Sequence, residues 1–278
     1  IESFYRQFYK RYFTTGVRSS QKLSFEFEKY RPEKILNQIE THFRDLGYMG
    51  IIPDVRFYSH HDCQANAAYH CHSYDHAAVI VLDGAAETST LSAYLVKNST
   101  FEKLVQYHIP HSLGWFYRVF ARYCGFVQQT GDVHLMNLSG WGKHDDILSA
   151  FMDSAVYLRD YQLHVAKRYA FAHQNEMDWN TLSGIFSVLG DPRMPHQPFS
   201  QHHFDIAFAA QRKIESICFE IYELLKMKIE NLPLLFAGEL SENTLLMAKI
   251  AEKHREPVSV QPGADSAGGA LGAAICAM

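Results

Sequence analysis

Between Pro32 and Gly47 the apolar residues recur at the spacing of one helix face. These residues are Ile35, Leu36, Ile39, Phe43 and Leu46. Proline in a first turn and glycine after a last turn are typical of helix ends, so the pattern predicts an amphipathic helix, which we expect to cover a sheet. A short helix is also predicted at residues 4–13, and a strand at residues 55–59.

The pattern changes in the next stretch, residues 59–87. A polar turn at Ser59 leads into residues that favour helix, which places His60 and Gln64 one turn apart on the same face. Residues 77–82 then form an unbroken apolar run that stops at Asp83, which is followed by glycine. Such a run is typical of a buried central strand, and open α/β folds usually bind ligands at the carboxyl ends of their strands. Asp83 is therefore a candidate site residue.

The rest of the chain alternates between strand and helix patterns, which predicts an α/β fold. A strand at residues 92–98 is expected to form a hairpin with residues 79–83, with its turn within residues 85–90. Further strands are predicted at 232–237 and 258–261, and helices at 113–124, 145–170, 204–227, 243–254 and 267–277. Residues 131–143 and 177–201 are predicted to be loops.

Composition and charge narrow the function classes. The chain has 278 residues, 47% of them hydrophobic, and a net charge of −4, so no basic surface for nucleic acid or acidic membranes is indicated. Five scattered cysteines predict neither a disulfide framework nor a zinc ribbon. With no long apolar run and no signal-peptide pattern, a cytoplasmic location is expected. A histidine-rich segment, comprising His70, Cys71, His72 and His76, is expected to be a surface loop because its spacing fits no standard zinc ligand set.

Five stretches, in this order along the chain, resemble the O-carbamoyltransferase family of antibiotic and nodulation-factor biosynthesis. They are residues 59–87, 109–117, 131–138, 235–243 and 261–274. The resemblance covers residues 54–278 and leaves residues 1–53 as a helical segment of the first subdomain. It implies an α/β fold of the actin, sugar-kinase and heat-shock-protein (ASKHA) superfamily, with mixed sheets flanked by helices.

The resemblance also implies a reaction. ATP and carbamoyl phosphate give carbamoyl-adenylate, and the carbamoyl group passes to the hydroxyl of a small molecule at a divalent metal such as iron, zinc, manganese or magnesium. His60 and Asp83 are the implied catalytic residues, and both are also implied metal ligands. The other two ligand positions depart from the family pattern: Gln64 stands for a histidine and Ser266 for an aspartate. The adjacent Asp265 is the expected replacement, and His61, Asp62 and Cys63 are further candidates. Glutamine is a poorer ligand than imidazole for a transition metal.

The nucleotide site implied by the resemblance also departs from the family pattern. Its expected residues are Gly84, His134, Gly238, Asn243, Gly268 and Gly269. His134 stands for a lysine, and Glu239 stands for a glycine at a point where the backbone would approach the nucleotide. Two carboxylates beside a polyphosphate repel it unless a cation lies between them.

These departures leave a second hypothesis open, in which the chain is a catalytically degenerate homologue that acts as a binding or scaffolding subunit. A phosphotransferase of the same superfamily is a third hypothesis, for which we find no motif. The family's opening strand and its carbamoyl-phosphate domain do not match these residues, so a second carbamoyltransferase domain or subunit is an expected partner. The pattern specifies neither the hydroxyl acceptor nor the oligomeric state.

Overall fold

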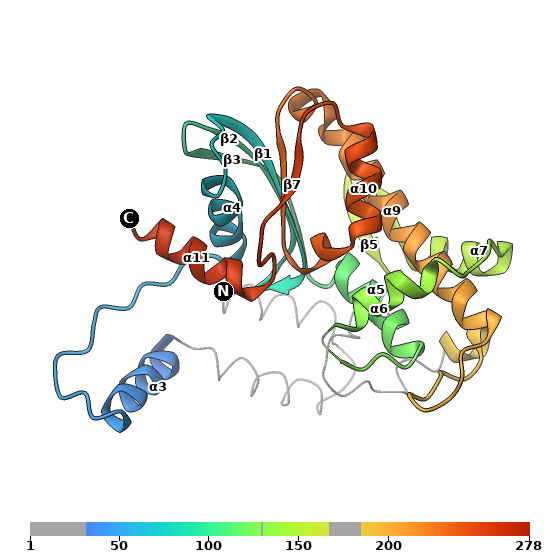
Figure 1. Cartoon of the computed structure of the whole chain (residues 1–278), viewed down its shortest axis with the longest axis horizontal. Helices are drawn as coiled ribbons and strands as arrows, with labels where there is room; N and C mark the ends of the chain where they lie inside the picture. Colours follow the sequence, from blue (N-terminus) through green and yellow to red (C-terminus); the bar gives the residue numbers. More distant parts are fainter. Residues whose placement is uncertain (1–31, 129, 167–184) are drawn as a thin grey trace. The chain divides into compact units, whose positions relative to one another are not determined.

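The computed structural model describes residues 32–128, 130–166 and 185–278 and divides into two compact units, residues 1–57 and 58–278 (Figure 1). In the first unit, α3 (Pro32–Asp45) is the predicted amphipathic helix, and none of its residues is buried. That α3 covers a sheet stays a prediction, and the helix predicted at residues 4–13 lies outside the described residues. Residues 55–59 form no strand, so that prediction is wrong: Phe57 is 53% exposed, and local side-chain preference alone does not supply a neighbouring strand.

One five-stranded sheet organises the second unit, in the order β3-β2-β1-β6-β7. The strands are β1 (His76–Ala86), β2 (Ser89–Lys97), β3 (Thr100–His108), β6 (Leu234–Ala237) and β7 (Val258–Val260). The pairs β1–β2 and β2–β3 are antiparallel, whereas β1–β6 and β6–β7 are parallel. The predicted α/β fold with a mixed sheet flanked by helices is thereby confirmed, and so is the hairpin of β1 with β2.

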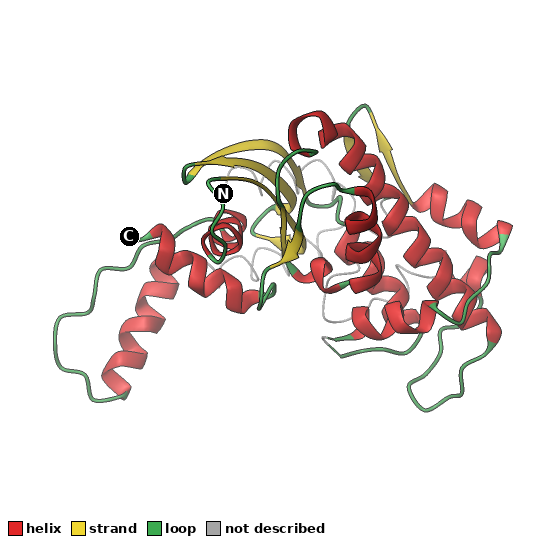
Figure 2. Cartoon of the chain, turned by 45° about the horizontal axis from the view of Figure 1, so that its top comes forward, coloured by secondary structure: helices red, strands yellow, loops and turns green. Residues whose placement is uncertain are grey.

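Alternation along β1 assigns its side chains to two cores. Ala77, Val79 and Val81 pack with α4 (His60–His70), and the intervening Ala78, Ile80 and Leu82 join a larger core on the opposite face. Figure 2 shows the resulting sheet with helices on both sides. Because successive side chains of a strand point to opposite faces, the next two positions, Asp83 and Gly84, also face opposite ways.

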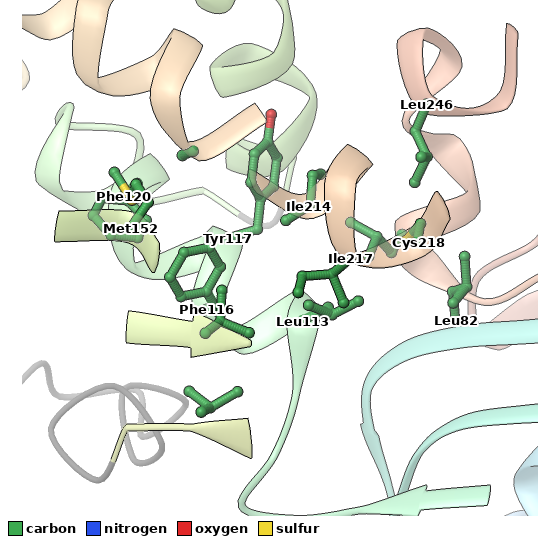
Figure 3. Close-up of a cluster of buried hydrophobic side chains, with 14 of the residues drawn as sticks. Leu82, Leu113, Phe116, Tyr117, Phe120, Met152, Ile214, Ile217, Cys218 and Leu246 are labelled. Carbon is green, nitrogen blue, oxygen red and sulfur yellow. The ribbon is translucent and has the colours of Figure 1, made fainter. Parts of the chain in front are cut away.

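The larger core is formed by helices of the chain's second half and by α5. Figure 3 shows Leu82 of β1 beside side chains of α5 (Leu113–Tyr123), α9 (Gln201–Ile229) and α10 (Thr244–Lys253). Phe116, Tyr117 and Ile214 are fully buried there. This burial removes much apolar surface from water, and it fixes the position of α5 against the end of β1.

Besides the strand at residues 55–59, two further predicted elements are wrong, and three strands were missed. Residues 131–139 form a helix, α6 (Gly131–Ser139), instead of a loop. The helix predicted at 145–170 is α7 (Asp146–Ala155), followed by a two-stranded hairpin of β4 (Val156–Arg159) and β5 (Gln162–Val165). The hairpin turn has two residues with positive φ, Asp160 (51°) and Tyr161 (61°), which matches strand twist. The missed strands are β3, β4 and β5.

Helix α11 (Ser266–Cys276) packs against α4, below which it runs in Figure 1. A Cβ at Gly272 would stand 1.8 Å from the carbonyl oxygen of Cys63, so the absence of a side chain at this position lets the two helices approach.

The loop predicted at 177–201 is wrong at residues 185–189, which are helical. Residues 190–200 contain neither helix nor strand, and residues 177–184 lie outside the described residues. Within the part of the chain that is described, no helix is long and apolar enough to cross a membrane.

Candidate functional site

The carboxyl ends of the parallel strands β1, β6 and β7 gather the candidate residues. Asp83 and Gly84 lie where the pairing of β1 with β2 becomes irregular, beyond Leu82. Glu239 follows β6 directly after Gly238, and Asp265 lies in the segment that joins β7 to α11. Since parallel strands end at the same edge of a sheet, residues more than 150 positions apart in the sequence meet here.

His60 and Asp83 are in contact at this edge, as the sequence predicted for a shared site. His60 begins α4, and its Nε2 lies 3.4 Å from Asp83 Oδ2. The backbone N–H of His60 donates to the carboxylate of Glu87, which stabilises the start of the helix. The Asp83 carboxylate raises the pKa of the His60 imidazole, and this effect exceeds the lowering caused by burial.

Gln64 lies one turn further along α4 and joins this pair to α11. Its Nε2 lies 3.0 Å from His60 Nε2 and donates to the backbone carbonyl of Asp265 at 2.9 Å. The Asp265 carboxylate itself accepts the N–H of Ala267 and caps α11. The structure therefore brings together all four predicted metal-binding residues, but Asp265 is committed to the helix start.

His61, one of the further residues that the sequence offers as a replacement ligand, lies at the same strand end. It is fully buried, its Nδ1 lies 2.8 Å from the Ser92 hydroxyl, and its Nε2 lies 3.6 Å from Asp83 Oδ2. Burial lowers the pKa of His61 to about 4, so the ring is neutral near pH 7. The available signal was its adjacency to His60: at a helix start, neighbouring side chains diverge by about a quarter turn, and both rings reach the strand end.

One carboxylate oxygen of Asp83 accepts a hydrogen bond, whereas the other accepts none. Its Oδ1 accepts the backbone N–H of Glu239 at 2.9 Å. Burial raises the pKa of Asp83, but His60 and the Glu239 N–H outweigh that effect and hold the pKa below its usual range. Three buried atoms at this point accept or donate no hydrogen bond, namely Asp83 Oδ2, Gln64 Oε1 and His61 Nε2. Unpartnered polar atoms in a cluster are typical of a site that receives a ligand, an ion or water.

On the opposite face of the strand end, Gly84 meets α5. The Ser112 hydroxyl donates to the Gly84 carbonyl oxygen and accepts the N–H of Trp115, which caps α5. A Cβ at Gly114 would stand 2.8 Å from Gly84 Cα, so the first turn of α5 is in direct contact with the strand end. The positive end of the α5 dipole thus faces Gly84.

An ion-pair cluster lies beside Gly84. Arg118 of α5 pairs with Glu239 at 2.7 Å (Nη2–Oε2) and with Asp132 of α6 at 3.1 Å (Nη2–Oδ2). Burial raises the pKa of Asp132, although Arg118 opposes that effect. Sequence reasoning singled out Glu239 but missed Arg118 and Asp132, because an arginine within an aromatic helix carries no local signal for its partner.

Three of the glycines predicted to bind the nucleotide lie close to the strand ends. Gly238 has φ = 92°, and a Cβ there would stand 2.3 Å from the Leu82 carbonyl oxygen, so the fold itself requires glycine. Gly268 and Gly269 of α11 lie against Gln64 and His60, respectively. Their glycine identity brings the start of α11 up to the candidate site.

Asn243 and His134 are engaged elsewhere. Asn243 is 5% exposed, caps α10 by accepting the N–H of Leu246, and exchanges side-chain hydrogen bonds with Gln211. His134 is an exposed residue of α6 whose ring stacks on Phe126 with centroids 5.3 Å apart. Neither residue is in contact with His60 or Asp83 through any interaction that the structure shows, so a role in nucleotide binding stays a prediction for both.

Among the described residues, no group of three or more His, Cys, Asp or Glu side chains is arranged to hold a metal ion. Of the segment predicted to be a surface loop, Cys71 and His72 lie between α4 and β1, whereas His70 ends α4 and His76 begins β1, so the loop is shorter than predicted.

Several known proteins are similar to this chain. An activator of 2-hydroxyisocaproyl-CoA dehydratase from Clostridium difficile, solved with bound ADPNP, superposes with a TM-score of 0.45 at 14% identity, covering 82% of this chain and 69% of that one. An uncharacterised Synechocystis protein is 30% identical over 81% of this chain, and the nodulation protein NolO of Bradyrhizobium diazoefficiens is 26% identical over 78%. The chain spans 36% and 37% of the lengths of these two relatives. The family model for the carbamoyltransferase N-terminus matches residues 5–275, and the chain belongs to this family.

Proposed function

We propose that this chain is the part of an O-carbamoyltransferase that handles the activated carbamoyl group. In the proposed reaction, ATP, carbamoyl phosphate and one water give carbamoyl-adenylate, phosphate and pyrophosphate. The hydroxyl oxygen of a small molecule then attacks the carbamoyl carbon, and AMP leaves. Family membership supports the class of reaction. The observation that carries the proposal is the His60–Asp83 contact at the strand ends, where a buried Asp83 oxygen is left without a hydrogen bond.

The roles follow from charge and position. Asp83 raises the pKa of His60, which makes its imidazole a better acceptor for the proton that the hydroxyl loses when its oxygen attacks the carbamoyl carbon. The Glu239 N–H fixes one oxygen of Asp83 and thereby orients the other toward His60. A neutral His61 on the far side of Asp83 Oδ2 keeps a second positive charge out of the site.

The donor atoms fit a divalent cation that prefers oxygen. Asp83 Oδ2 and Gln64 Oε1 are buried lone-pair donors without hydrogen bonds. His60 Nε2 lies beside them and would serve either as a ligand or as the proton acceptor, but not as both at once. Carboxylate and amide oxygens suit Mg²⁺ or Mn²⁺ better than iron or zinc. Such a cation, when bound, would polarise a phosphate or carbonyl oxygen. Asp265 would contribute as a ligand only if its carboxylate left the cap of α11.

A second candidate function is a catalytically degenerate subunit that binds or scaffolds an active carbamoyltransferase. The observation that favours it is Gln64, which stands where the family has an imidazole ligand. Its amide nitrogen is hydrogen-bonded to His60 and to the backbone at the start of α11. A site closed by such bonds holds α4 to α11 whether or not any ligand enters. A scaffold predicts no saturable ATP binding.

Calorimetric titration with ATP in the presence of Mg²⁺ or Mn²⁺, with elemental analysis of the same sample, separates the two. The enzyme proposal predicts saturable binding that His60→Ala and Asp83→Asn both weaken by about tenfold or more. His144→Ala is the matched control, because its side chain is exposed and pairs only with neighbours on its own segment. If no heat of ATP binding is measured with either cation, the proposal that the chain binds a nucleotide is refuted and the scaffold is supported. Incubation with ATP, carbamoyl phosphate and test alcohols then reports transfer by mass spectrometry.

A further inference from the structure

The Glu239 carboxylate projects from the turn after β6 into the space between Gly84 and α5. Its Oε2 lies 2.7 Å from Arg118 Nη2, and it would stand 3.7 Å from a Cβ at Gly84. In the resembling family a glycine stands at the Glu239 position, so this side chain is an addition to the strand-end turn. It fills space that a glycine would leave open.

The surroundings of this carboxylate are those of an anion-binding position. The first turn of α5, whose N–H groups carry partial positive charge, is in contact with Gly84. Arg118, one turn further along α5, supplies a full positive charge. A carboxylate of the chain, that of Glu239, already occupies this position: it is bonded to the guanidinium and lies near Gly84.

The charge balance opposes a second anion while Glu239 remains in place. Arg118 already forms ion pairs with two carboxylates, those of Glu239 and Asp132. One oxygen of Asp132 is buried without a hydrogen bond. A phosphoryl group approaching Arg118 therefore meets like charges on several sides.

The geometry points to Glu239 as an internal competitor for the anion position beside Arg118, so that a phosphoryl group of the ligand enters only when Glu239 leaves the guanidinium. The identity of the anion as phosphoryl rests on the proposed function. The pair is suited to opening, because its side chains are 25% and 32% exposed, so water can reach each charge when the pair separates. Glu239 is thus a specificity-determining residue, which discriminates against ligands that cannot displace a carboxylate.

The test is calorimetric titration of the full chain with inorganic pyrophosphate, without added metal. Glu239→Gln removes the charge and keeps the size of the side chain, and we expect it to bind pyrophosphate at least about tenfold more tightly than the unmodified chain. Glu239→Ala is the second variant, in case the amide still bonds to Arg118. Thermal unfolding followed by circular dichroism verifies that both variants fold.

Glu242→Gln is the matched control, because Glu242 is exposed, lies three residues further along, and gives the same change in net charge without touching Arg118. We expect its affinity to change by less than about twofold. In the double variant with Arg118→Gln, the gain caused by Glu239→Gln should disappear. Three results would overturn the inference. Glu239→Gln could gain no more affinity for pyrophosphate than Glu242→Gln, the gain could persist in the double variant with Arg118→Gln, or neither Glu239 variant could bind pyrophosphate. Failure of the unmodified chain to bind ATP concerns the proposed function alone.

Discussion

Replacement of His61 by asparagine should remove a large part of the loss of stability that the protein suffers at acid pH. His61 is fully buried against Asp83 and Ser92, and burial lowers its pKa from 6.5 to about 4. In the folded chain the ring is neutral at pH 5, whereas in the unfolded chain it is protonated. Asparagine places an amide near the Ser92 hydroxyl and does not titrate.

The sign and size follow from linkage. A histidine whose folded-state pKa is depressed contributes stability above its unfolded pKa and loses it as pH falls. The contribution of His61 is therefore present above pH 6.5 and is lost between pH 6.5 and about 4. One pKa unit corresponds to about 1.4 kcal/mol, so the whole interval corresponds to about 3 kcal/mol, of which about 2 kcal/mol is lost by pH 5.

Urea unfolding at pH 7, 6 and 5 measures this effect as the free energy of unfolding of the unmodified chain and of His61→Asn. Other histidines titrate in the same range, but they do so in both proteins, so the difference between the two pH profiles isolates His61. His144→Asn, at an exposed histidine, should reproduce the unmodified profile. If His61→Asn loses as much stability between pH 7 and 5 as the unmodified chain, the ring is not held neutral and its place beside Asp83 is misjudged.

Two further predictions concern packing around the site. Gly272→Ala should lower the free energy of unfolding by about 2 kcal/mol, since its Cβ would stand 1.8 Å from the Cys63 carbonyl oxygen. The control Gly269→Ala, whose Cβ would make only ordinary van der Waals contacts, should be neutral or stabilising. Equal melting temperatures for the two variants would contradict this account. Ser112→Ala removes both the cap of α5 and the bond to the Gly84 carbonyl, and should cost about 1–2 kcal/mol in urea unfolding, with an unchanged value indicating that neither bond stabilises the strand end.

Local signals were sufficient for the parts of the candidate site that lie on one element. The helical spacing of His60 and Gln64 and the end of an apolar run at Asp83 were both readable, and the structure has His60 in contact with each of the others. His61 was only one of three further candidates, because a helix period assigns it to another face, whereas at the first turn it too reaches the strand. Arg118 escaped because its partners, Asp132 and Glu239, come from two other elements.

Sequence by itself determined the elements whose order follows from repeating side-chain patterns. These include β1, α9 and the β/α alternation of the second half, because burial of one face or of both faces imposes a period that can be read directly. It also determined family membership, since motif order is a property of the chain alone.

Only the tertiary structure decided what depends on contacts between distant segments. After Ala155 the chain turns into a hairpin, although the sequence pattern was interpreted as a continuing helix, because pairing of β4 with β5 and burial of Val156 and Leu163 outweigh weak local preferences. In the same way, Glu239 was visible in the sequence as a carboxylate in a glycine's place, but its partner was not. A charge finds its counter-ion by proximity in space, and the proximity of α5 to the end of β6 exists only in the folded chain.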